Sequence, residues 1–137
     1  MNKLLWVLQV LLAAAFLAHG LMFLFPPASL IAVMNASINP SFRLFLGVAE
    51  VLAAIGLTLP GLTRIQPWLV PAAAAGLMIV MIGAVSFHVA RGEVSSAITT
   101  AILLALLTFV AYMRWKVQPI LPRTPGDLGA RSADARR

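Results

Sequence analysis

Of all residues in this chain, Glu50 is the hardest to explain by a purely structural role. It lies in the middle of the stretch from Ser41 to Pro60, SFRLFLGVAEVLAAIGLTLP, which is otherwise almost entirely apolar. A carboxylate at mid-depth of a hydrophobic span costs roughly 2.5–3.5 kcal/mol on insertion scales, so it is retained mainly where the fold uses it. Glu50 is therefore the first candidate for hydrogen bonding or proton exchange with a ligand. The alternative is one half of a polar pair that clamps two helices together.

Four more side chains could bind a ligand together with Glu50: His19, Arg43, His88 and Arg91. Arg43 shares a helical stripe with Glu50, but an arginine side chain leans toward the helix N-terminus, which disfavours a direct ion pair. His88 and Arg91, one turn apart, are the expected partners of Glu50 from a neighbouring helix. The alternatives are that the arginines are charges at the membrane interface and that the histidines have only packing roles.

Several kinds of chemistry are not expected. The chain has no cysteine, which excludes disulfides, thiolate catalysis and cysteine-ligated metals. His19 and His88 differ in expected depth by roughly 6 Å at 1.5 Å per helical residue, so no haem is expected between them. Two histidines and one carboxylate on three helices have no zinc-site spacing, and no metal is expected. The sequence also lacks a serine triad and a glycine-rich phosphate loop.

The elements that position these residues are apolar helices. Of the 137 residues 61% are hydrophobic and only 10% are charged, with a mean hydropathy of +0.98. A soluble domain is about half apolar and about a quarter charged, so the composition predicts an integral membrane protein with the lipid bilayer around it. We expect a multi-pass protein of the cell membrane, in a bacterium the inner membrane.

Four spans are predicted, over about residues 4–25, 42–59, 67–90 and 95–113, and they form one all-α, four-transmembrane-helix domain over 1–113. The first is too long for the apolar part of a signal peptide, so it is expected to be retained. Proline and glycine separate the spans at Pro26-Pro27, Pro60-Gly61 and Arg91-Gly92. Residues 28–40 are read as an apolar loop that lies on the membrane or covers the helix ends as a lid.

The charges and tryptophans predict that both termini are cytoplasmic. All lysines and arginines except Arg43 and Arg91 fall at the start, in the loop at 62–66 or in the tail. Trp6, Trp68 and Trp115 lie at the same helix ends, where indoles suit the headgroup level. Residues 114–137 are read as a basic, disordered cytoplasmic tail. The net charge of +6 is thus a topology signal and a possible contact with anionic lipid, and no nucleic acid is expected.

This orientation gathers the polar residues into the outer half of the bundle. His19, Glu50 and His88 come from three different spans, and the fourth contributes hydroxyls. Small residues on the spans favour close helix packing, which would bring these groups within hydrogen-bonding range. The sequence therefore predicts one polar pocket, although the hydroxyls could instead bond back to their own helix. The hydroxyl-bearing residues are Ser95, Ser96, Thr99 and Thr100.

The chain resembles the DoxX-like family of small four-helix membrane proteins over about residues 5–112. The resemblance is carried by AHGLMFLF in the first span, FRLFLGVAEVLAAIGLTLPGL in the second, and PWLVPAAAAGLMIVMIGAVSFHVARGE after it. It implies a four-helix bundle in which Glu50 and His88 are functional positions. The family is named after a subunit of a thiosulfate:quinone oxidoreductase, and relatives are linked to membrane redox systems, which does not imply thiosulfate chemistry here.

Three functions are weighed. The first is a small-ligand site for a quinone or other lipophilic molecule in a redox-linked accessory protein, with Glu50 and His88 at the head group and phenylalanines around the apolar body. The second is a non-catalytic assembly protein whose partner is a membrane protein or a second copy of the chain. The third is a small transporter or a lipid-modifying enzyme, which the single four-helix unit favours less. Whether the protein is an enzyme stays open. The phenylalanines are Phe16, Phe23, Phe45 and Phe87.

Overall fold

The computed structural model describes residues 2–124, and every regular element in this range is a helix. Four helices are long and apolar enough to cross a membrane. The predicted all-α bundle of four membrane-spanning helices is therefore confirmed. The long helices are α1 (Asn2–Leu24), α3 (Pro40–Thr63), α4 (Leu69–Ala90) and α5 (Val94–Tyr112), which continues into the π-helical turn η1 (Met113–Val117).

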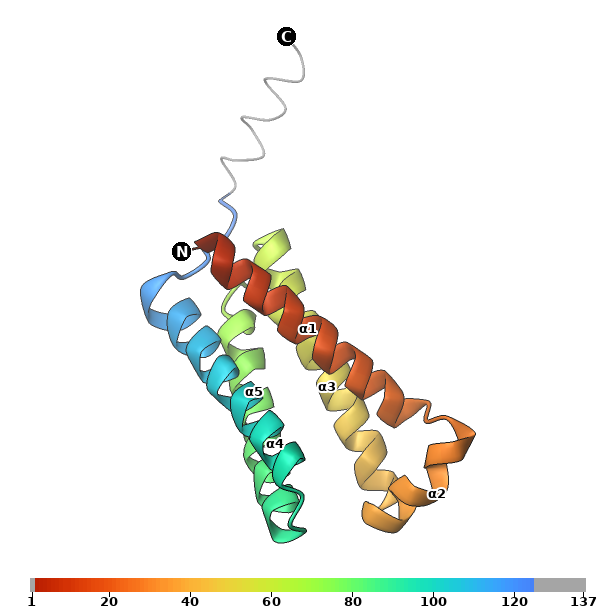
Figure 1. Cartoon of the computed structure of the whole chain (residues 1–137). Helices are drawn as coiled ribbons and strands as arrows, with labels where there is room; N and C mark the ends of the chain where they lie inside the picture. The colour runs from red at the N-terminus through yellow and green to blue at the C-terminus, as the bar shows by residue number, and fades with distance from the viewer. Residues whose placement is uncertain (1, 125–137) are drawn as a thin grey trace.

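The four long helices pack as two pairs. α1 lies along α3, α4 lies along α5, and α3 contacts α4 to join the pairs. Figure 1 shows the pairs close together at the end that holds the start of α1 and the end of α5, here called the terminal end. They diverge toward the opposite end, the α2 end, which holds α2 (Ala28–Ser37) and the α4–α5 turn. Buried leucines such as Leu12, Leu57, Leu77 and Leu107 fill the core between the helices.

Residues 28–37 form a helix, so the prediction of a loop over 28–40 is wrong for most of that segment. Pro27 precedes the first turn of α2, and its carbonyl accepts hydrogen bonds from the Leu30 and Ile31 N–H groups at 2.9 and 3.2 Å. A proline has a preset φ and no N–H to leave unpaired, so it suits a helix start. No residue of α2 is buried in the protein. An apolar helix with no buried face suits contact with lipid.

α3 is longer at both ends than predicted. The Asn39 side chain accepts a hydrogen bond from the Ser41 N–H at 2.9 Å and caps the helix, with Pro40 in its first turn. The helix also continues through Pro60, where the sequence predicts its end, and stops at Arg64 in the left-handed conformation with φ 57°. Proline is tolerated inside membrane helices because neighbouring groups or small local adjustments can satisfy the carbonyl that it leaves without a partner.

The first part of the predicted tail packs against the terminal end. Arg114 in η1 is only 3% exposed, and the Arg123 N–H donates to the Arg64 carbonyl at 3.1 Å. The prediction of a disordered tail starting at residue 114 is therefore wrong for this part. The proline and glycine content of this segment indicates disorder, and it does not show that polar side chains on α1 bind Arg114. Residues 125–137 of the predicted tail lie outside the described range.

The orientation of the termini stays a prediction that thiol labelling can check. The chain lacks cysteine, so single cysteines report without background. Ser37→Cys and Ser95→Cys at the α2 end should react with a membrane-impermeant thiol reagent applied outside cells, and Thr124→Cys at the terminal end should not. Labelling of Thr124→Cys alone from outside would contradict cytoplasmic termini and reverse the side on which the α2 end lies.

Candidate functional site

Two glycines bring α1 and α3 into backbone contact. A β-carbon added at Gly20 would lie 2.9 Å from the Gly47 carbonyl oxygen and 3.1 Å from the Glu50 β-carbon. One added at Gly47 would lie 3.0 Å from the Gly20 carbonyl oxygen. Only residues without a side chain permit this approach, as is common where membrane helices associate. The contact places His19, next to Gly20, directly beside Glu50 on α3.

His19 and Glu50 form a hydrogen-bonded pair. The distance from His19 Nδ1 to Glu50 Oε2 is 2.6 Å, and the Glu50 side chain is 1% exposed while that of His19 is 45% exposed. The His19 ring also contacts the Phe23 ring, with centroids 4.3 Å apart, which restrains its orientation. The carboxylate is therefore buried, and the imidazole that covers it remains accessible.

This geometry suits a group that gives or takes a proton. An ionised carboxylate only accepts hydrogen bonds, so it fixes the proton of a neutral His19 on Nδ1 and leaves Nε2 as an acceptor. If the imidazole is protonated, Nε2 becomes a donor, and Glu50 stabilises that charge. Among the described residues Nε2 has no hydrogen-bond partner. It is available to an oxygen or nitrogen atom of a ligand.

The pair lies in the wall of a large cleft between the two helix pairs at the α2 end. The cleft has a volume of about 1010 Å³, which is enough for a drug-sized or lipid-like molecule. His19 and Glu50 line it from the α1–α3 side and His88 from α4. The remaining lining is mostly apolar and aromatic, with hydroxyls from α5 and two polar residues, Ser37 and Asn39, near the start of α3. Its larger apolar residues and the α5 hydroxyls are Phe16, Phe42, Phe45, Leu46, Ile79, Val80, Met81, Phe87, Leu103, Ser95, Ser96, Thr99 and Thr100.

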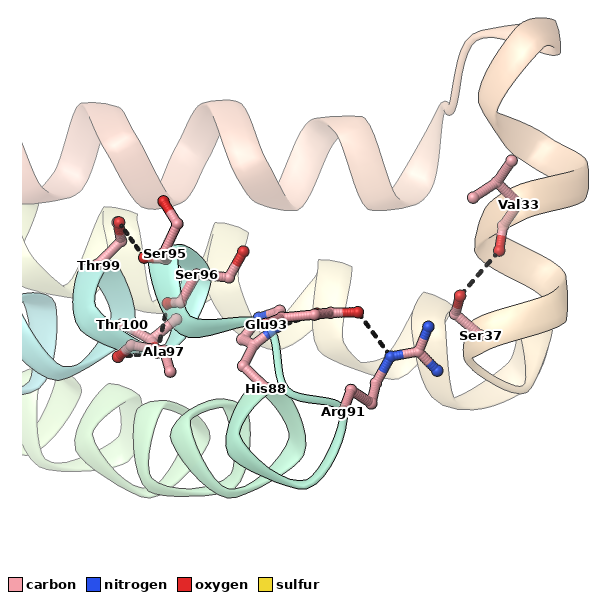
Figure 2. Close-up of polar contacts among 10 residues, drawn as sticks. All are labelled: Val33, Ser37, His88, Arg91, Glu93, Ser95, Ser96, Ala97, Thr99 and Thr100. Carbon is pink, nitrogen blue, oxygen red and sulfur yellow. Dashed lines mark hydrogen bonds and ion pairs between the residues drawn. The ribbon is translucent and has the colours of Figure 1, made fainter.

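A second histidine–carboxylate pair lies at the turn between α4 and α5 (Figure 2). His88 Nδ1 lies 2.6 Å from Glu93 Oε2, and Arg91 Nε donates to Glu93 Oε1 at 2.7 Å. Gly92 makes this turn possible, because its φ of +69° lies in the left-handed region that favours glycine. The Arg91 guanidinium lies 5.2 Å from the centre of the Phe87 ring. In this cluster, unlike the first, the carboxylate is partly exposed, at 36% against 1% for Glu50.

The expected partners of Glu50 were wrong. The sequence predicts His88 and Arg91, but these two residues bind Glu93, and His19 binds Glu50. The reason is helix pairing: α3 lies along α1 near Glu50, whereas the two helix pairs have already diverged there. His88 still reaches the cleft, while Arg91 is not among its lining residues.

Arg43 lies away from the cleft lining, in the contact between α1 and α3. It is 7% exposed, and its Nη1 donates to the Phe23 carbonyl at the end of α1. Its Nε has no hydrogen-bond partner within residues 2–124. A direct bond to Glu50 is absent among the described contacts, as the sequence predicts. Arg43 thus satisfies an end carbonyl of α1, which is a structural role consistent with its buried position.

The hydroxyls of α5 divide into two groups. Thr99 and Thr100 bond back to the Ser95 and Ser96 carbonyls at 3.0 and 2.9 Å, so the alternative of back-bonding is confirmed for them. The Ser95 and Ser96 side chains make no hydrogen bond to any residue in the described range. In Figure 2 the Ser95 hydroxyl points toward the α1 ribbon, the side on which the cleft lies.

Sequence reasoning missed three residues. The role of Gly20 was not predicted, because a small residue in an apolar span does not show from the sequence which helix it contacts. Gln9 is fully buried, and its amide donates to the Leu57 carbonyl at 2.7 Å and accepts from Arg114 Nε. A lone amide inside an apolar span was the available signal for Gln9, because such a group requires a partner in a membrane. Its partner Arg114 had been assigned to the tail.

The exposed turn cluster gives a pH prediction. The hydrogen bond from Arg91, followed by that from His88, holds the pKa of Glu93 below its ordinary value of 4.5. A lowered pKa in the folded state means that the contribution of Glu93 is present above the unfolded value and is lost as the pH falls through the folded value. The protection factors of the amides at residues 90–95, which are exchange rates corrected for their intrinsic pH dependence, should therefore fall as the pH drops below about 4.5. Glu93→Gln should remove this acid-side loss of protection; protection that does not change below about pH 4.5 would contradict the assignment.

Comparison with known proteins agrees with this architecture. The model of the DoxX-like family matches residues 7–110, a range that covers most of α1 and α5, all of α3 and α4, and both histidine–carboxylate pairs. No curated protein and no solved structure matches the chain. The match covers well over half of the sequence, and the protein belongs to the DoxX-like family.

Proposed function

We propose that the cleft at the α2 end binds a lipophilic small molecule whose head group carries an oxygen atom, and that His19 bonds to that atom. The single observation that carries this proposal is the His19–Glu50 pair at 2.6 Å in the wall of a cleft of about 1010 Å³. A buried carboxylate that orients an accessible imidazole is a usual arrangement for proton exchange with a bound molecule. The apolar lining would hold the rest of the ligand.

A quinone is the ligand class that these groups suit best. Its ring carbonyls accept hydrogen bonds from a protonated imidazole, and the hydroxyls of the reduced form donate to a neutral one. Phe16, Phe45 and Phe87 line the cleft and would contact the ring or its tail, while Phe23 serves the site by packing on His19. His88 and the two serines of α5 would reach the far side of the head group. The protein would then act as a redox-linked accessory of the cell membrane, the inner membrane in a bacterium.

Retention of the ligand tests this proposal. The protein should be purified in mild detergent, and its bound small molecules extracted and identified by mass spectrometry. We expect a quinone or lipid at near-equal molar ratio, with at least about a tenfold loss for Glu50→Gln, since a charge-assisted hydrogen bond contributes roughly 1.5–3 kcal/mol. Asp134→Asn makes the same carboxylate-to-amide change outside the residues matched by the family model and should retain the ligand.

Two outcomes would count against a ligand site. Equal retention by Glu50→Gln and the unchanged protein would show that the co-purified molecule lies elsewhere. No bound molecule in either, together with a membrane-protein partner that co-purifies equally with both, would support the alternative of an assembly protein. In that case the buried pair would serve only to fix the α1–α3 contact.

A further inference from the structure

A second cleft lies at the terminal end, on the far side of the bundle from the ligand cleft. It has a volume of about 460 Å³, and its lining includes Asn2, Trp6, Arg64, Arg114 and Gln118. Gly61 on α3 lets two side chains of the lining pack against its backbone: an added β-carbon there would lie 2.8 Å from both the Trp6 ring and the Ile120 side chain. The chain after η1 therefore folds across the end of α3 and closes one wall of the cleft.

Arg114 is the central cation of this cleft. It is 3% exposed, and its guanidinium lies 5.1 Å from the centre of the Trp6 ring. Its Nη1 donates to the Asn2 side chain at 2.9 Å and to the Gln118 carbonyl at 3.2 Å, and its Nε donates to Gln9. All these acceptors are neutral. Its Nη2 has no hydrogen-bond partner within residues 2–124.

No carboxylate in the described range neutralises Arg114. Glu50 is paired with His19, and Glu93 is paired with His88 and Arg91, all toward the α2 end. A buried charge is strongly unfavourable unless it is paired. Neutral acceptors and an aromatic face reduce this cost but leave the charge in place. An anion that the described residues do not supply would therefore stabilise the charge of Arg114.

We propose that the terminal-end cleft binds a phosphate group, with Arg114 as the buried cation and Arg64 as a second, exposed one. The Nη2 of Arg114 can donate to a phosphate oxygen, the exposed guanidinium of Arg64 can donate a parallel pair of hydrogen bonds, and two arginines in one cleft match the charge of such a group. Trp6 next to them is the residue type found at the headgroup level of a bilayer, where lipid phosphates lie. The phosphate could belong to a phospholipid or be free in solution, and both share the chemistry argued here.

Thermal unfolding of the purified full chain in detergent tests this site. Added phosphatidylglycerol should raise the melting temperature more than phosphatidylcholine does. Arg64→Gln should weaken this response about tenfold in lipid concentration, as loss of one charge-assisted contact predicts. Because the Arg64 side chain is exposed, that variant should fold, which guards against misfolding of Arg114→Gln. Lys116→Gln removes one charge from the same end outside the cleft lining and should respond like the unchanged protein.

Further measurements distinguish free phosphate from phospholipid and identify the results that would contradict the site. Inorganic phosphate that raises the melting temperature in the absence of lipid would assign free phosphate, and no such response would assign the lipid. Equal responses of Arg64→Gln and Lys116→Gln would overturn the site. So would an Asp127→Asn/Asp134→Asn variant that is destabilised as much as Arg114→Gln, because a carboxylate of the chain would then be the anion. None of these results depends on what the cleft at the α2 end binds.

Discussion

Replacing His19 by leucine is expected to lower the free energy of unfolding by about 3–5 kcal/mol, because it leaves the carboxylate of Glu50 buried without its partner. Glu50→Leu should cost far less, since the histidine that it leaves behind is 45% exposed and can be solvated. The double variant should lie close to Glu50→Leu, because removing both partners leaves no unpaired buried charge. The asymmetry between the two single variants follows directly from the exposures of 1% and 45%.

The second histidine–carboxylate pair provides a matched control for this cycle. His88 and Glu93 are joined at the same distance of 2.6 Å, but their side chains are 24% and 36% exposed. Their coupling should be much weaker than that of His19 and Glu50, as for surface ion pairs. Both cycles can be measured by unfolding in mixed micelles, followed by helical circular dichroism. Similar small effects for His19→Leu and His88→Leu would show that Glu50 does not depend on His19.

The spans and the need of Glu50 for a polar partner could be predicted from sequence because they follow from local composition. A run of apolar residues sets a helix in a membrane, and a lone carboxylate in it requires a partner wherever the helix packs. Gly92 with its neighbours could likewise be read as the break between the last two spans, and the structure places that turn between Ala90 and Val94. None of these inferences required knowing which helices lie side by side.

The partner of Glu50 could not be predicted because it depends on helix pairing. The periodicity of α3 gives the direction of Glu50 around its helix but does not say whether α1 or α4 lies there. Gly20 decides this, since it lets α1 approach α3 at that depth, and His19 follows from it. Helix packing also explains why the burial of Arg114 could not be predicted. Its partner Gln9 lies on α1, more than a hundred residues earlier in the chain. Both errors concern contacts between segments that are distant in sequence.

Gly20→Ala is expected to destabilise the protein by about 1–3 kcal/mol, the usual cost of forcing a methyl group into a packed contact. The obstacles are the Gly47 carbonyl oxygen at 2.9 Å and the Glu50 and Val51 side chains at 3.1 Å, so α1 and α3 must move apart. That movement lengthens the His19–Glu50 hydrogen bond, and retention of the ligand in the proposed site should fall with stability.

Gly76→Ala should change the stability in the opposite direction, which makes it a sensitive control for Gly20→Ala. Both glycines lie inside membrane-spanning helices, but a β-carbon at Gly76 meets nothing within 4 Å. Alanine is favoured over glycine in a helix by up to about 1 kcal/mol, so Gly76→Ala should be neutral or slightly stabilising. Unfolding in mixed micelles measures both variants. If Gly20→Ala proved as stable as Gly76→Ala, the close contact of α1 with α3 would not hold, and the His19–Glu50 pair that depends on it would lose its structural basis.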